Sequence, residues 1–149
     1  RFHHGTWLRT AIEEQLVDTH RTVLIGLRAP RFGDGETRFL LKAGARLWTP
    51  WDLKDSRLAT QLQGDIARVG QGAAYVSLDL DALDPAFCPA VAEPVPGGLN
   101  VMRTIALLRQ THTWARPWVG ADVMELAGTL EGAEATARVG AHLALHLLA

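Results

Sequence analysis

The chain has 149 residues, of which 48% are hydrophobic and 21% are charged, a balance typical of one globular domain rather than a disordered or membrane-spanning chain. Its 15 Lys and Arg residues nearly balance its 16 Asp and Glu residues, and the net charge of -1 gives no attraction for nucleic acid or an anionic membrane. The single cysteine, Cys88, excludes an internal disulfide and zinc-finger spacings, which favours a reducing, cytoplasmic environment.

Helical and strand-like patterns alternate along the sequence. Apolar residues at helical spacing predict helices, and short, continuously apolar runs predict strands that are covered on both faces. The alternation favours βαβ units in an α/β fold, a three-layer α/β/α arrangement with a mainly parallel sheet. The predicted elements, in chain order, are a helix at 7–17, a strand at 22–27, a short helix at 36–43, a brief strand at 45–48, a helix at 55–69, a strand at 73–81, a helix from Asn100, a strand at 118–124 and a helix at 134–148.

Local signals mark several ends of these elements. The first ten residues, RFHHGTWLRT, lack an initiator Met and an apolar signal segment, so we expect the chain to be part of a longer protein. Thr6 and Asn100 are the expected N-caps of the helices that follow them, because their side chains can accept backbone N–H groups. Residues 30–35 are rich in turn-forming residues and are expected to form an exposed loop.

The strongest chemical signal is the segment Ser77-Leu-Asp-Leu-Asp81. On a strand, Asp79 and Asp81 point to the same face, at the carboxyl end where parallel sheets bind ligands. Two carboxylates this close repel each other unless a cation lies between them, which indicates a divalent metal. The alternative is that one acid caps the following loop while the other is solvated. A phosphoryl or glycosyl transferase is a weaker hypothesis, because we find no glycine-rich phosphate-binding turn.

A proline-rich loop from Asp84 to Gly98 follows the two acids and is expected to form a rigid rim. Asp84 is expected to bond the turn before Pro85. Together with three further segments, and in the family's order along the chain, the acids and the loop resemble the ureohydrolases, the arginase and agmatinase family. The match is nearest to the agmatinase-like branch. The matching residues are His4-Gly-Thr, Thr22 to Arg28, Ser77-x-Asp-x-Asp81 with Pro85, Pro89, Ala90 and Gly98, and Gly120-Ala-Asp-Val-Met-Glu125.

The resemblance implies a partial ureohydrolase fold, with residues 1–149 as the C-terminal portion of a single domain. It also implies a binuclear Mn²⁺ centre and the hydrolysis of a guanidino compound, such as agmatine, to urea and an amine. The expected partner is a small guanidino substrate, with no nucleic acid and no membrane, and the expected assembly is a homo-oligomer.

Four residues take roles from the resemblance. Asp79 and Asp81 correspond to metal ligands, and hard carboxylate oxygens suit Mn²⁺. His4 matches a histidine that moves protons, and Glu125 matches a carboxylate that orients the guanidinium. The alternatives remain open that His4 is a solvated terminal residue and that Glu125 is a loop-capping or surface acid.

The sequence also departs from the family pattern. The family supplies a His in a G-G-D-H-S segment and an Asp-x-His-x-Asp cluster upstream, and neither is present here. Two carboxylates cannot hold two Mn²⁺ ions, so we expect this chain alone to be inactive. Glu93 replaces the usual Thr in the rim, where it either attracts a positively charged substrate tail or points into water. The alternative function is a non-catalytic homologue that acts as a binding or assembly subunit.

Overall fold

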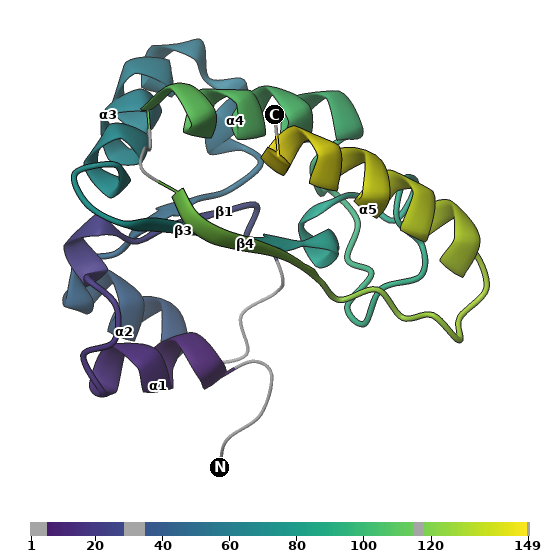
Figure 1. Cartoon of the computed structure of the whole chain (residues 1–149), viewed down its shortest axis with the longest axis horizontal. Helices are drawn as coiled ribbons and strands as arrows, with labels where there is room; N and C mark the ends of the chain where they lie inside the picture. Colours follow the sequence, from purple (N-terminus) through teal and green to yellow (C-terminus); the bar gives the residue numbers. More distant parts are fainter. Residues whose placement is uncertain (1–5, 29–34, 115–117, 149) are drawn as a thin grey trace.

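The computed structural model describes residues 6–28, 35–114 and 118–148 of the chain. Helices and short strands alternate along these segments, as predicted (Figure 1). They are α1 (Trp7–Glu13), β1 (Val23–Ile25), α2 (Gly35–Ala43), β2 (Arg46–Trp48), α3 (Ala59–Val69), β3 (Ala74–Asp79), α4 (Val101–Trp114), β4 (Trp118–Met124) and α5 (Ala133–Leu148), with 3-10 turns at Thr19–Arg21, Asp52–Lys54, Ser56–Leu58 and Leu80–Ala82.

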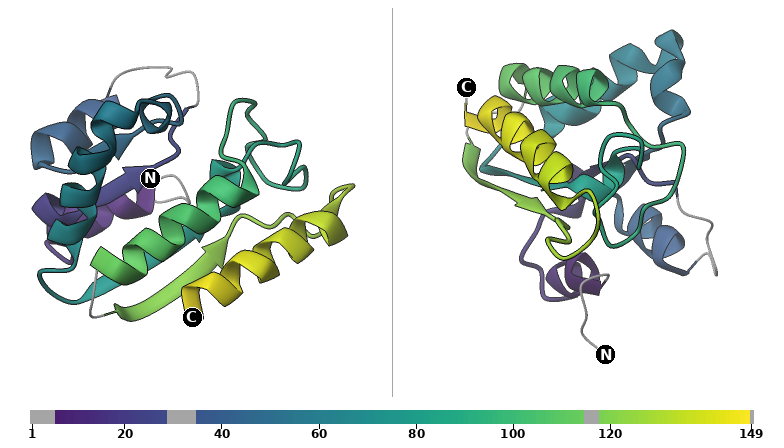
Figure 2. Two further views of the ribbon diagram at one scale, coloured as in Figure 1. Left: turned by 90° about the horizontal axis from the view of Figure 1, so that it is seen from above. Right: turned by 90° about the vertical axis from the view of Figure 1, so that its right-hand side faces the viewer.

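The helices form a layer on each side of the strands. α3, α4 and α5 lie on one side, and α1 and α2 lie on the other, as the views of Figures 1 and 2 agree. α4 packs against both α3 and α5, which makes the first layer continuous. The expected three-layer α/β/α arrangement is therefore confirmed.

The strands form two parallel pairs. β1 pairs with β2, and β3 pairs with β4. Within the described segments the two pairs are separate ladders, so the sheet expected from the sequence is present as two parallel halves. The carboxyl end of β1 nevertheless meets the turn after β3, because a β-carbon added to Gly26 would lie 3.1 Å from that of Ala82. Gly26 also has a φ of 98°, a conformation that favours glycine.

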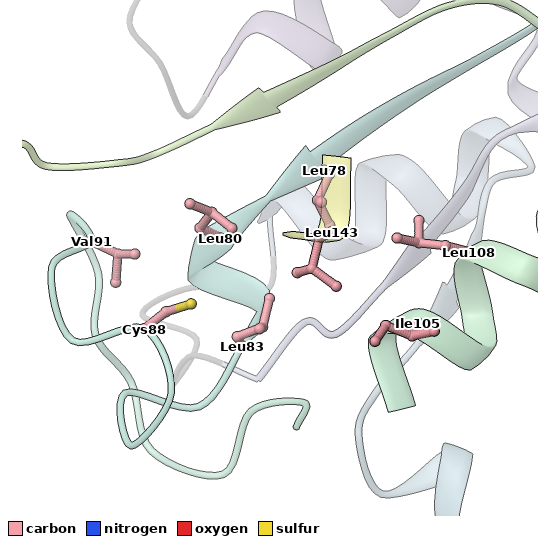
Figure 3. Close-up of a cluster of buried hydrophobic side chains, with 8 residues drawn as sticks. All are labelled: Leu78, Leu80, Leu83, Cys88, Val91, Ile105, Leu108 and Leu143. Atoms are coloured by element: carbon pink, nitrogen blue, oxygen red, sulfur yellow. The ribbon is translucent and has the colours of Figure 1, made fainter. Parts of the chain in front are cut away.

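Two hydrophobic clusters stabilise the two halves. The first joins β3 and the turns that follow it to α4 and α5, and the second joins β2 to α3 and α4. Cys88 is fully buried in the first cluster, and burial raises the pKa of its thiol to about 11, which keeps the thiol protonated near neutral pH. The buried members of the first cluster are Leu78, Leu80, Leu83, Cys88, Val91, Ile105, Leu108 and Leu143 (Figure 3), and those of the second are Trp48, Leu62, Ile66, Leu99 and Leu107.

The faces of β3 differ in exposure. Leu78 points into the first cluster, whereas Tyr75 is 56% exposed and Ser77 is also exposed. The expectation that this strand is covered on both faces was therefore wrong for the described part of the chain. The exposed face carries a cross-strand pair, because the hydroxyl of Tyr75 donates to Oδ2 of Asp122 in β4 at 2.8 Å.

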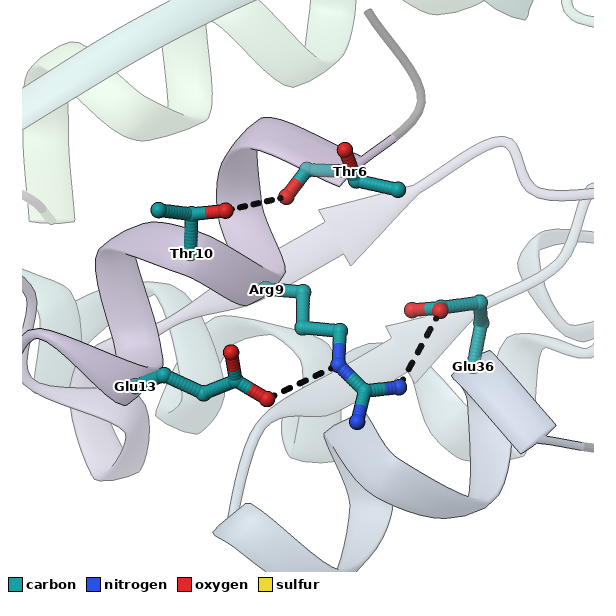
Figure 4. Close-up of polar contacts among 5 residues, drawn as sticks. All are labelled: Thr6, Arg9, Thr10, Glu13 and Glu36. Atoms are coloured by element: carbon teal, nitrogen blue, oxygen red, sulfur yellow. Dashed lines mark hydrogen bonds and ion pairs between the residues drawn. The ribbon is translucent and has the colours of Figure 1, made fainter. Parts of the chain in front are cut away.

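Polar contacts connect α1 and α2 (Figure 4). Nε of Arg9 donates to Glu13 at 2.9 Å within α1, and Nη1 of the same guanidinium donates to Glu36 in α2 at 3.3 Å. Thr6 is the N-cap residue, as predicted, but it makes no side-chain capping hydrogen bond. α1 ends at Glu13 rather than near residue 17, because Gln15 adopts a positive φ of 57° that a helix cannot continue through.

Other predicted boundaries hold more closely. Asn100 caps α4, since its Oδ1 accepts the N–H of Arg103 at 2.7 Å. The helix predicted at 55–69 begins as a 3-10 turn capped by Asp55 and becomes α-helical at Ala59. The loop predicted at 30–35 lies almost entirely outside the described residues. None of the helices described is long and apolar enough to cross a membrane.

Candidate metal and substrate site

The acidic pair lies at the carboxyl end of β3. Asp79 is the last residue of the strand, and Asp81 lies in the 3-10 turn that follows. Oδ1 of Asp79 caps this turn by accepting the N–H of Asp81 at 2.7 Å. The expectation that both acids lie on the strand was therefore wrong, because the side chain of Asp79 binds the backbone and favours a turn. The turn keeps the two carboxylates close enough for each charge to affect the other.

The turn partly distinguishes the two hypotheses for Asp79 and Asp81, which are a metal-binding pair or one capping acid with one solvated acid. Asp79 caps the backbone, as the alternative from the sequence foresaw, but Asp81 is half-buried rather than solvated. Burial raises the pKa of Asp81, and the negative charges of Asp79 and Glu93 raise it further. The N–H of Glu93, which donates to Oδ1 of Asp81 at 3.3 Å, and the charge of Arg28 oppose this rise. The site therefore favours an added positive charge.

The residues of the proline-rich segment 84–98, which we call the rim loop, are organised by Asp84. Its carboxylate accepts the N–H groups of Ala86 at 3.0 Å, Gly97 at 2.7 Å and Gly98 at 3.2 Å. These backbone donors hold the pKa of Asp84 below its usual value. The structural role predicted for Asp84 is confirmed, and it extends to the far end of the loop. Gly98 is required there, because a β-carbon would lie 2.5 Å from the backbone nitrogen of Asp84.

Glu125 lies at the same edge as the acidic pair. Asp79 is level with Met124 in the parallel register of β3 and β4, so Glu125 follows directly at the carboxyl end of β4. Its φ of 68° is unusual for a residue other than glycine, and such strain is found where the surroundings fix the backbone for a function. The surroundings here are the rim loop, since Leu126 bridges to Val91 and the N–H of Ala127 donates to Ala90 at 3.0 Å.

The structure thus brings several predicted site residues together. Asp81 interacts with both Asp79 and Glu93, and Glu125 follows at the adjacent strand end. The side chain of Glu93 is exposed while its backbone contacts Asp81. His4 lies outside the described residues.

Two residues were missed from the sequence. Arg28 donates to carbonyls on both sides of the rim loop, and Thr136 of α5 accepts the N–H of Ala90 at 3.0 Å. An arginine directly after an apolar strand is a signal that could have indicated the first, since the charge needs a partner at the strand end. We find no sequence signal for Thr136, because its partner is distant along the chain.

The donor set fits a hard divalent cation in kind and only partly in number. Carboxylate oxygens of Asp79 and Asp81 suit Mn²⁺ or a similar ion, and burial, followed by the charges of Asp79 and Glu93, raises the pKa of Asp81, so a cation there would stabilise its ionised form. Across the described residues, no group of three or more His, Cys, Asp or Glu side chains is arranged to hold a metal ion. The two aspartates are therefore part of a ligand set at most.

Comparison with known proteins decides the family. A family model described as the arginase family matches residues 1–149. The chain belongs to the arginase family. The resemblance drawn from the motifs is thereby confirmed, and so is the partial arginase-type fold.

Three relatives illustrate this membership of the arginase family. A guanidinopropionase from Pseudomonas aeruginosa is 37% identical over 97% of this chain and 45% of its own length. An agmatinase from Photorhabdus laumondii is 36% identical over 99% of this chain and 45% of its own length. The solved structure of proclavaminate amidino hydrolase from Streptomyces clavuligerus has a TM-score of 0.87 and 33% identity, and the match covers 99% of this chain and 48% of that one. The chain spans about half the length of the relatives that it matches.

Proposed function

We propose that the whole protein containing this chain hydrolyses a guanidino compound to urea and an amine, with two Mn²⁺ ions at the active site. In this proposal residues 1–149 form the C-terminal portion of a single ureohydrolase domain. The observation that carries it is the pairing of Asp79 and Asp81 at a parallel strand end, where the pKa of Asp81 is raised and a cation would be stabilised. Relatives named agmatinase and guanidinopropionase support the same reaction class.

The roles of the residues follow from their chemistry. Asp79 and Asp81 would hold the metal, together with ligands from elsewhere in the whole protein. Bound Mn²⁺ supplies Lewis-acid activation of water near neutral pH. Glu125, at the neighbouring strand end, would orient the planar guanidinium through paired hydrogen bonds, for which a carboxylate is well suited. His4 would move protons to and from the reacting groups, since the ordinary pKa of an imidazole lies near neutral pH.

Agmatine is the proposed substrate, because of the charge on the rim loop. The guanidinopropionase and the agmatinase have almost equal identity to this chain, and they carry the names of different guanidino substrates. The choice between substrates therefore falls to individual rim residues. Glu93 places a carboxylate beside Asp81, and a carboxylate there would favour a substrate whose tail is an amine.

The experiment measures urea release by the whole protein with Mn²⁺ and a panel of guanidino substrates. Asp79→Asn is expected to lower kcat/KM by at least about a hundredfold, above the range typical of residues that only support a ligand. Asp55→Asn is the matched control, because Asp55 also caps a 3-10 turn by accepting an N–H two residues later, that of Arg57 at 3.0 Å. If capping alone mattered, the two variants would lose similar activity.

A second outcome would support the non-catalytic alternative. If the whole protein releases no urea from any substrate with Mn²⁺ present, and lacks the His and the Asp-x-His-x-Asp cluster expected upstream, the fold has been retained for binding or assembly. In that case Asp79→Asn would leave the binding or assembly function of the protein unchanged.

A further inference from the structure

We propose that Arg28 is a positioning residue, which fixes the rim loop over the acidic pair by joining the carboxyl end of β1 to both sides of that loop. The guanidinium donates from Nε to the carbonyl of Val95 at 2.8 Å and from Nη2 to the carbonyl of Leu83 at 3.1 Å. Leu83 directly precedes the rim loop, and Val95 lies near its far end. One side chain therefore fixes the distance between Leu83, at the start of the rim loop, and the segment around Val95, which we call the far arm of the loop.

A guanidinium is well suited to this connection from the end of β1. Its planar group presents several N–H donors in a fixed fork: Nε donates to the carbonyl of Val95, and Nη2 donates to the carbonyls of both Val95, at 2.5 Å, and Leu83. The accepting groups are backbone carbonyls, so the connection does not depend on the side chains of Leu83 or Val95. Close packing supports it, since Gly26 of the same strand end lies against Ala82.

The position of the far arm is passed on to the acids through the backbone. The N–H of Val95 donates to the carbonyl of Glu93 at 2.8 Å, and the N–H of Glu93 donates to Oδ1 of Asp81. A change at Val95 therefore moves the group that holds Asp81 in place. Asp84 ties the two ends of the loop together by separate bonds to Gly97 and Gly98, so we expect the loop to stay closed while the segment around Val95 shifts when Arg28 is replaced.

Charge explains why a half-buried guanidinium is tolerated here. Arg28 is attracted by Asp81, Asp84 and Asp79, which partly offsets the cost of removing its charge from water. The same attraction acts on Asp81, which faces the repulsion of Asp79 and Glu93. Arg28 thus stabilises the acidic edge by its charge and the rim loop by its geometry.

The structural part of this inference is independent of the reaction, and its consequence for substrate binding rests on the proposed function. If the rim loop contacts the substrate, a displaced far arm weakens binding more than it slows the chemical step. We therefore expect a change in KM larger than the change in kcat when Arg28 is replaced.

The test uses the whole protein with Arg28→Met and Arg28→Lys. Hydrogen exchange of the peptide spanning residues 84–99 is expected to be about tenfold faster in Arg28→Met, because every bond to the two carbonyls is lost, and to rise less in Arg28→Lys, because one ammonium nitrogen replaces the fork. Arg103→Met is the matched control, since Arg103 also makes a half-buried contact with a carbonyl, that of Leu53 at 2.9 Å, on a different part of the molecule. It is expected to leave exchange in 84–99 unchanged.

Agmatine hydrolysis by the same variants gives the second readout. An increase of about tenfold in KM with a smaller change in kcat supports the positioning role, and Arg103→Met is expected to change neither. The inference is overturned if exchange in 84–99 is unchanged in both Arg28→Lys and Arg28→Met. It is also overturned if Arg103→Met accelerates exchange in 84–99 as much as Arg28→Met does. If exchange in 84–99 is faster in the Arg28 variants but the wild-type protein releases no urea, the proposed function is refuted and the role of Arg28 in the rim loop stands. If Arg28→Met does not fold, Arg28→Lys, which keeps the charge, carries the same test.

Discussion

The carboxylate of Glu93 is a third negative charge beside Asp79 and Asp81, and one substitution tests its effect on the choice of substrate. Unit charges about 4 Å apart interact by about 4 kcal/mol at an effective dielectric constant of about 20, and the exposure of this side chain reduces that value considerably. We predict that Glu93→Thr lowers the preference for agmatine over 4-guanidinobutyrate by about tenfold in kcat/KM. The measurement compares both substrates in the whole protein with and without the substitution.

Glu14→Thr is the control for this prediction. Glu14 is also an exposed glutamate, but it lies at the end of α1, away from the rim loop. The ratio of the two kcat/KM values is expected to stay constant in this variant. An unchanged ratio in Glu93→Thr would mean that its side chain points into water and does not select the substrate.

Residue identities could be predicted where the signal is local. Asp79 and Asp81 were found because two acids follow an apolar run at the expected carboxyl end of a strand, and Asp84 was found because it precedes a proline in a turn. Arg28 and the strained backbone of Glu125 could not be found in this way. Their positions depend on partners in the rim loop that are brought close only by the fold.

At the scale of elements, Thr136 joins α5 to the rim loop. Its side chain is fully buried, and its Oγ1 accepts the N–H of Ala90 at 3.0 Å. We predict that Thr136→Val lowers the free energy of unfolding by about 1–3 kcal/mol, because the buried N–H of Ala90 is left without a partner. Chemical denaturation of the whole protein measures this loss as a lower midpoint with an unchanged slope.

Thr136→Ser separates the hydrogen bond from packing. Serine keeps the hydroxyl and loses a methyl group, so we expect it to lose less stability than the valine variant, which keeps the shape and loses the acceptor. A larger loss in Thr136→Ser than in Thr136→Val would show that packing, and not the bond to Ala90, joins the helix to the loop.

The order of the elements could be predicted from periodicity, but several ends could not. Apolar spacing and short apolar runs indicated most of the helices and strands, since burial requires them, whereas the pattern at 36–43 was ambiguous. The end of β3 is set instead by the carboxylate of Asp79, and the end of α1 by the backbone of Gln15. Both are single-residue effects that compete with a longer pattern. Coverage of β3 on both faces was predicted wrongly, because α4 and α5 cover one face in the described structure.

At the scale of the whole molecule, apolar surface gathers around β4. Among the described strands β4 pairs on one side only, with β3, and Val119 on it is 67% exposed. An open hollow of about 230 Å³ lies beside it, between the ends of β3 and β4 and helix α5. Its lining is almost entirely apolar and consists of Leu80, Val123, Leu126, Ala137, Gly140, Ala141 and Ala144.

An unpaired strand edge next to exposed apolar groups favours pairing with another chain. We therefore predict that the 149-residue chain, prepared alone, associates as its concentration rises through the micromolar range, and sedimentation velocity would detect this as an increasing sedimentation coefficient. Val119→Lys is expected to weaken the association, because a charged side chain on an edge strand opposes strand addition. Leu16→Lys, at a residue that is 71% exposed beyond α1, is the control and is expected to leave the association unchanged. A compact monomer that unfolds cooperatively at every concentration would contradict the prediction, and it would mean that these residues form a complete domain instead of a portion of one.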